Sequence, residues 1–73
     1  MESEFIEFLW KDDQSNVGDC PSLSRGRQDG RDGYFIVGKP TDPALRTQIP
    51  QVGSGEIVSF VPANVIDRIR DLP

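Results

Sequence analysis

The sequence predicts one small α+β domain over residues 1–73, built as a three-stranded, mostly antiparallel sheet with a short C-terminal helix. Two β-branched and aromatic runs, at 34–37 and 56–61, each follow a glycine and end at a glycine or proline, as strands commonly do. Beyond Pro62, apolar side chains recur at the spacing of one helix face, namely Val65, Ile66, Ile69 and Leu72. A helix of about eleven residues is too short to be stable alone, so we expect this stripe to pack on the sheet.

The remaining elements follow from local signals. The run 34–37 has apolar residues on both faces, which predicts a strand covered on both sides and therefore a central position. A shorter strand is expected at 20–24, with Cys20 and Pro21 at its start, because proline is tolerated in the first residues of a strand. Asp42 followed by proline predicts the beginning of one or two helical turns.

The N-terminal segment 3–10 is dense in large apolar side chains and fits two interpretations. As a short helix it would begin at Ser3, whose hydroxyl can cap the first turn. As a strand it would place Ile6, Phe8 and Trp10 on one face. Periodicity alone does not separate these alternatives, and we favour the short N-terminal helix.

Composition limits the function classes. With 73 residues the chain forms a thin core, and small domains of this size are commonly stabilised by disulfides, a metal or a partner chain. Cys20 is the only cysteine and there is no histidine, so neither an intrachain disulfide nor a structural zinc site is expected. The net charge of −4 argues against a general nucleic-acid binder. The unpaired thiol and the lack of a recognisable signal peptide or membrane-spanning run indicate the cytoplasm.

No residue pattern predicts a catalytic, cofactor or metal site. Cys20 has no histidine to act as its base, so we expect a structural role for it. The carboxylates in turn-rich segments do not have the spacing of a Ca²⁺ loop, and we expect solvated side chains at Asp12, Asp13, Asp19, Asp29 and Asp32. The glycines lack the spacing of a dinucleotide fingerprint and indicate turns.

Two groups of residues are candidates for partner binding. Arg25, Arg27 and Arg31 fall in the segment 25–33, which contains two Asp-Gly turn signals and is predicted to be a mobile hairpin loop. Their guanidinium groups could bind phosphate or the acidic surface of a partner. They could equally neutralise the acidic residues of the same molecule or of a twin in a dimer, and we favour this alternative.

Phe8 and Trp10 form the second candidate group. Tryptophan is enriched at the centres of protein interfaces, so these aromatic side chains could anchor a partner. In so small a domain they are also needed for the core. The core is the preferred interpretation.

Several short motifs resemble a known family. They are Asp19-Cys20-Pro21-Ser22-Leu23, Gly33-Tyr34-Phe35-Ile36-Val37-Gly38-Lys39, Thr41-Asp42-Pro43 and Gly55-Glu56-Ile57-Val58-Ser59-Phe60-Val61-Pro62. With Trp10, their order over residues 19–72 is similar to that of a group of small actinobacterial proteins and, more distantly, of the BldB-like developmental-regulator family of streptomycetes. The arginine-rich stretch 25–31 is longer than the corresponding part of that family's pattern. The resemblance implies a non-enzymatic protein that accompanies helix-turn-helix regulators, with some members self-associating.

Together these observations predict a non-enzymatic, cytoplasmic regulatory module that acts through protein contacts. Its expected partner is another protein, for example a helix-turn-helix transcriptional regulator or a second copy in a homodimer, and no membrane contact is expected. The alternative is a nucleic-acid-binding accessory protein that uses Arg25, Arg27 and Arg31 on phosphate.

Overall fold

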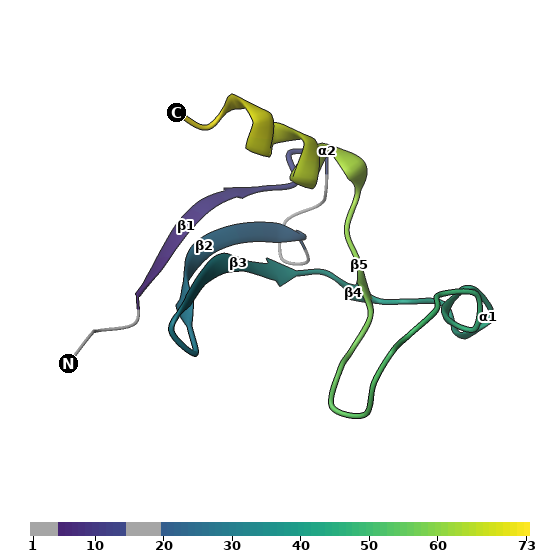
Figure 1. Cartoon of the computed structure of the whole chain (residues 1–73). Helices are drawn as coiled ribbons and strands as arrows, with labels where there is room; N and C mark the ends of the chain where they lie inside the picture. Colours follow the sequence, from purple (N-terminus) through teal and green to yellow (C-terminus); the bar gives the residue numbers. More distant parts are fainter. Residues whose placement is uncertain (1–4, 15–19) are drawn as a thin grey trace.

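The structure is a computed structural model that describes residues 5–14 and 20–73. It contains a three-stranded antiparallel sheet in the order β1-β2-β3, formed by β1 (Ile6–Lys11), β2 (Ser22–Gln28) and β3 (Arg31–Val37) (Figure 1). A short helical segment follows at the C-terminus, so the predicted α+β class is confirmed. Ser3, the expected N-cap, lies outside the described residues. Residues 15–19 also lie outside them, including Asp19, which was expected to be solvated.

The prediction of an N-terminal helix is wrong, because this segment forms β1. A helix of this length has little stability in water, whereas a strand gains backbone pairing with β2 along its length. The pairing is not regular. Phe8 lies opposite Ser24, but Trp10 lies opposite Leu23, so Leu9 is an extra residue in β1. This is a β-bulge, which shifts the side-chain alternation by one position.

The segment 25–33 is also not the predicted loop. Strands β2 and β3 pair without interruption until Gln28 meets Arg31, leaving only Asp29 and Gly30 as the turn. Both turn residues have positive φ, 54° and 77°, as a two-residue type I′ hairpin requires. The second Asp-Gly pair lies inside β3 instead.

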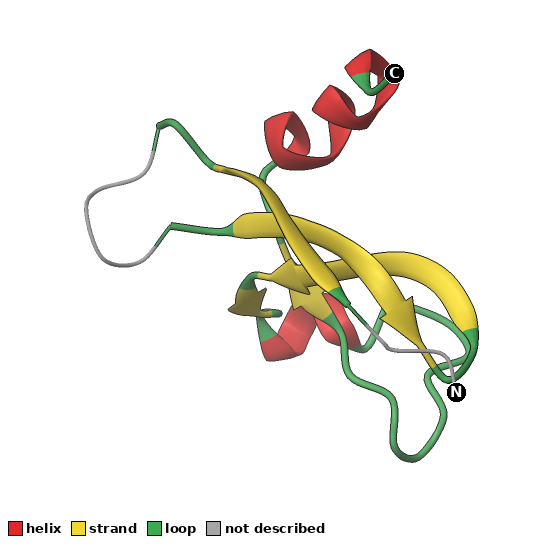
Figure 2. Cartoon of the chain, turned by 90° about the vertical axis from the view of Figure 1, so that its left-hand side faces the viewer, coloured by secondary structure: helices red, strands yellow, loops and turns green. Residues whose placement is uncertain are grey.

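Strand β3 is an edge strand and β2 is central, which corrects the predicted central position of 34–37. Apolar residues on both faces of β3 led to that expectation. The structure covers neither face of β3 completely, since Tyr34, Ile36 and Val37 are all exposed. Figure 2 shows the twist of the sheet, with the C-terminal helical segment near one end of its strands.

Residues 39–60 form a projecting arm beside the sheet (Figure 1). Strand β4 (Lys39–Pro40) enters the arm, α1 (Pro43–Arg46) lies at its far side, and β5 (Ser59–Phe60) returns antiparallel to β4. The predicted start of α1 is confirmed, because the Asp42 carboxylate accepts a 2.8 Å hydrogen bond from the backbone N–H of Ala44.

The strand predicted over 56–61 is largely wrong, since only its residues 59–60 are paired, and they pair with β4 in a separate sheet. Glu56 belongs to a turn instead. Its backbone N–H donates to the Gly53 carbonyl at 3.0 Å, and its carboxylate accepts from the Gly53 N–H at 2.9 Å. Ile57 follows with 89% of its surface exposed, so no neighbouring strand covers it.

The C-terminal segment consists of α2 (Ala63–Asp67) followed by the 3-10 helix η1 (Arg68–Asp71), close to the predicted extent. Its stripe packs on the sheet mainly through Val65. Within the described part of the chain, Leu23 and Val65 are the only fully buried large apolar side chains. The core therefore sits where α2 meets the central strand, and it is very small.

Three contacts hold the C-terminal helical segment against β1 and the residue that follows it. The indole Nε1 of Trp10 donates a 2.7 Å hydrogen bond to the carbonyl of Val65, and the Arg68 guanidinium lies 4.6 Å from the centre of the indole ring. The carboxylate of Asp12 accepts a 3.0 Å hydrogen bond from the side-chain amide of Asn64. Asp12 is buried, so the expectation that it is solvated is wrong.

Candidate functional site

The register of the sheet assigns its side chains to two faces. Residues opposite one another on neighbouring strands share a face, and successive residues of a strand alternate. We call the face on which α2 packs the helix face; it carries Glu7, Trp10, Leu23, Arg25, Arg27, Asp32, Tyr34 and Ile36. We call the other the open face; it carries Ile6, Phe8, Lys11, Ser22, Ser24, Gly26, Gln28, Arg31, Gly33, Phe35 and Val37.

The bulge at Leu9 separates the two aromatic residues that the sequence grouped together. Without it, Phe8 and Trp10 would share a face. With it, Trp10 turns to the helix face beside Leu23 and contributes to the core, as preferred from the sequence. Phe8 turns to the open face, where 61% of its surface is exposed. The interface interpretation therefore remains available for Phe8.

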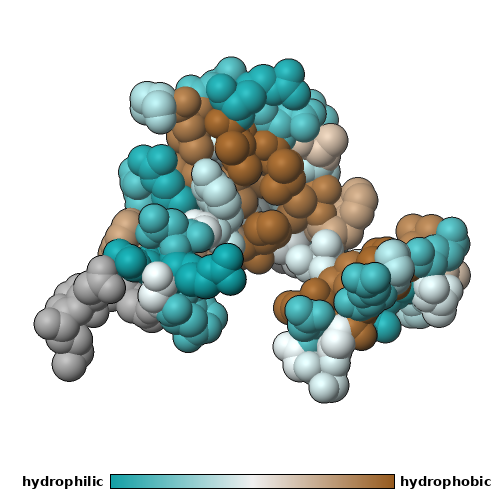
Figure 3. All heavy atoms as spheres, in the orientation of Figure 1, coloured by the Kyte–Doolittle hydropathy of each residue, from teal (hydrophilic) through white to brown (hydrophobic). Residues whose placement is uncertain are grey.

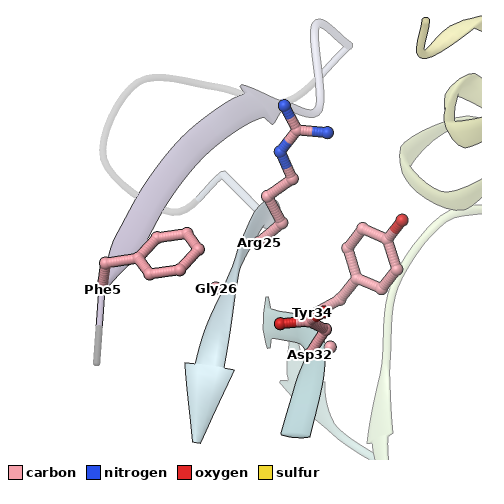
Figure 4. Close-up of a pocket in the computed structure, with 6 residues that line it drawn as sticks. Phe5, Arg25, Gly26, Asp32 and Tyr34 are labelled. Carbon is pink, nitrogen blue, oxygen red and sulfur yellow. The ribbon is translucent and has the colours of Figure 1, made fainter. Parts of the chain in front are cut away.

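The polar end of the helix face holds an ion pair across β1 and β2. The guanidinium of Arg25 lies 2.8 Å from the Glu7 carboxylate, and this hydrogen bond raises the pKa of Arg25 above its ordinary value. Next to it is a hollow lined by Phe5, Arg25, Gly26, Asp32, Gly33 and Tyr34, toward which Phe5 points from the position just before β1 (Figure 4). The hollow is open to solvent, and its arginine is already engaged with a carboxylate.

The three arginines do not form one surface. Arg25 and Arg27 lie on the helix face, whereas Arg31 lies on the open face. Arg27 also has partners within the chain, since its guanidinium is 4.0 Å from Asp32 and donates to the carbonyl of Gly30 at 3.3 Å. Intramolecular pairing, the preferred interpretation, is thus observed for two of the three. A single phosphate group could not be held by all three.

The open face of the sheet carries several exposed apolar side chains. Ile6, Phe8 and Val37 expose 68%, 61% and 60% of their surfaces, and Phe35 is partly exposed. In the central strand the same face carries only Ser22, Ser24 and Gly26. A row of small residues therefore runs along β2 between two rows of bulkier ones.

The sequence pattern does not single out Ile6, Phe35 and Val37 as surface residues. One signal for them exists in β2, where small side chains alternate with Leu23, Arg25 and Arg27. That alternation marks one face of the strand as small and polar. The rows that border it become visible only when the strands are paired.

The arm adds a second apolar surface. Leu45, Ile49, Ile57 and Phe60 are all exposed on it. Figure 3 shows the arm as a lobe separated from the sheet and helix, with brown side chains on both parts. Neither part covers the other in this view.

Reactive groups are sparse in the described residues. Cys20 is half-buried, and the described part of the chain contains no cluster of three or more side chains that could hold a metal ion. No described helix is long and apolar enough to cross a membrane. Comparison with models of known families, with curated proteins and with solved structures finds no significant match.

Proposed function

We propose that this chain is a non-enzymatic protein-interaction module with a regulatory role, and that it completes its core against another protein. The observation that carries the proposal is the amount of surface left exposed. The chain exposes 6096 Å², whereas a compact monomer of 8.1 kDa is expected to expose about 4,500 Å².

The excess of about 1,600 Å² lies within the range that one partner buries in an obligate complex, roughly 1,000–2,500 Å². The radius of gyration agrees. It is 14.0 Å, against about 11 Å expected for 73 residues in a compact domain. Exposed apolar patches of this extent in a small protein mark interaction surfaces.

The partner classes follow from the sequence. The similarity to the BldB-like family points to a helix-turn-helix transcriptional regulator or to a second copy of the chain. We place the protein in the cytoplasm, where the thiol of a chain with one cysteine remains reduced. A regulatory role fits a module with no catalytic constellation among its described residues.

Two measurements test the proposal. Sedimentation equilibrium from about 1 μM to 1 mM distinguishes a monomer from a homodimer, since specific interfaces commonly have dissociation constants in or below this range. Each purified helix-turn-helix regulator encoded near the gene is then titrated calorimetrically. We expect either concentration-dependent dimerisation or binding with a negative heat-capacity change, the mark of apolar burial.

One outcome contradicts the proposal. It is a chain that stays monomeric over the whole concentration range, unfolds cooperatively on its own, and binds none of the regulators. Turnover of a small-molecule substrate by the purified chain would overturn its non-enzymatic part.

A further inference from the structure

On the open face a row of small residues runs between two rows of larger ones, and we call this arrangement the groove, with a floor and two walls. Its floor is the central strand, with Ser22 and Ser24 at one end and Gly26 toward the other. Ile6 and Phe8 on β1 form one wall, and Phe35 and Val37 on β3 form the other. The strands that carry the two walls lie about 10 Å apart, so a helix that lies on this face would contact both walls.

One end of the groove is partly closed. The ring of Phe35 leans over the central strand, because a Cβ built on Gly26 would lie 2.9 Å from the Phe35 Cε2 atom. Beside this ring is a hollow lined by Phe5, Ile6, Arg27, Gln28 and Phe35. Such a hollow can receive one large apolar side chain of a bound segment.

The charges of the open face all have one sign. Among its members in the three strands, the only charged residues are Lys11 and Arg31. The acidic residues of the paired strands, Glu7 and Asp32, point to the helix face. In a chain of net charge −4, the charged strand residues of this face are therefore cationic, while the exposed Asp13 and Asp29 lie in the turns beyond them.

The two cations stand at opposite ends of the groove. Lys11 aligns with Ser22 and Arg31 aligns with Gln28, at the two ends of β2. Six residues of extended strand separate these levels by about 20 Å, a length that roughly 13 residues of α-helix would span.

We propose that the open face binds an amphipathic helix of another protein, with an apolar stripe flanked by acidic side chains near its two ends. This inference rests on the proposed function and specifies its surface and partner chemistry. The groove presents side chains and no unpaired backbone groups, so it suits the apolar face of a helix rather than an added strand. A second copy stacked face to face would bring Lys11 and Arg31 of both chains into one interface, and like charges there disfavour association.

The test uses the full chain and two synthetic helical peptides as probes. Both carry the same leucine stripe; one has glutamates flanking it, and the other has lysines at the same positions. Binding is measured by fluorescence anisotropy at low salt. We expect the glutamate peptide to bind at least about tenfold more tightly, an effect of about 1.4 kcal/mol. The net charge of −4 by itself would favour the lysine peptide, so the two explanations predict opposite signs.

Three variants locate the binding. Phe8→Gln should weaken the glutamate peptide at least about tenfold, as expected for a residue at the centre of an interface. The matched control Ile57→Gln changes an apolar side chain that is 89% exposed on the arm, and should leave binding unchanged. The double variant Lys11→Glu, Arg31→Glu should reverse the preference between the two peptides. Trp10 fluorescence verifies that each variant keeps its native fold.

The inference is overturned if the two peptides bind equally, if neither binds, or if Phe8→Gln and Ile57→Gln behave alike. It is also overturned if the chain is a dimer that Phe8→Gln dissociates, since the groove then holds a second copy. A natural partner that binds the Phe8→Gln variant normally would leave the proposed function intact and reject this surface. A chain that binds no protein at all would reject the proposed function itself.

Discussion

Replacing Leu23 tests whether the described core is as small as it looks. Leu23 lies in the central strand and is fully buried on the face that α2 covers. Leu→Ala at such a site lowers the free energy of unfolding by about 2–5 kcal/mol. A domain of this length rarely gains more than about 3–5 kcal/mol from its core. The single substitution therefore removes most of the stability of the isolated chain.

Urea titration followed by far-UV circular dichroism and Trp10 fluorescence measures this effect. With a denaturant slope near 1 kcal/mol per molar, Leu23→Ala should lower the midpoint by about 2 M or leave the chain unfolded without denaturant. Leu45→Ala is the matched control, because it makes the same change at a side chain that is 58% exposed in α1. Its midpoint should move by less than about 0.5 M. Equal shifts for the two variants would refute the assignment of the core.

Two further predictions concern the backbone of the sheet. Gly26→Ala should destabilise the chain by about 1–3 kcal/mol, because the new Cβ would clash with the Phe5 carbonyl. Gly33→Ala, at the paired position in β3, brings its Cβ against no other atom and should be nearly neutral. Equal urea midpoints for the two variants would contradict this. Deleting Leu9 removes the extra residue but keeps Phe8 opposite Ser24 and Trp10 opposite Leu23, so the indole should stay on the helix face and the loss should be about 1 kcal/mol, as for Leu9→Ala. A Trp10 emission maximum that shifts in the deletion variant but stays native in Leu9→Ala would contradict this register.

Local signals predicted the parts of the fold that local chemistry decides. Asp42 before Pro43 is sufficient to begin α1, since the cap and the fixed proline φ act within one turn. Asp29-Gly30 is sufficient for the hairpin turn, because both residues tolerate positive φ. The sequence did not predict how far the strands extend around that turn. Charged residues such as Arg25 and Arg27 have little strand propensity, and here pairing with the neighbouring strands makes them part of β2.

The N-terminal strand shows why the candidate site was only half predicted. Both helix and strand periods fit the segment around Phe8, so tertiary pairing had to decide between them. Even the correct strand interpretation would have placed Phe8 and Trp10 together, because a bulge is invisible in a period-two pattern. That one inserted residue places Trp10 on the helix face and leaves Phe8 on the open face. Ile6 and Phe35 join Phe8 there only through the register of β2 with its two neighbours.

A core of this size also ties folding to partner binding. A partner present at a hundredfold excess over its dissociation constant stabilises the folded chain by about 2.7 kcal/mol. This gain is comparable to the free energy of unfolding that Leu23→Ala removes. A partner bound to the open face does not touch the helix face, so it should restore much of the fold of that variant. The same partner could not rescue a variant that lacks its own contact, such as Phe8→Gln. Phe8 on the open face and Leu23 on the helix face should therefore both affect the same folding equilibrium, Phe8 through partner binding and Leu23 through the core.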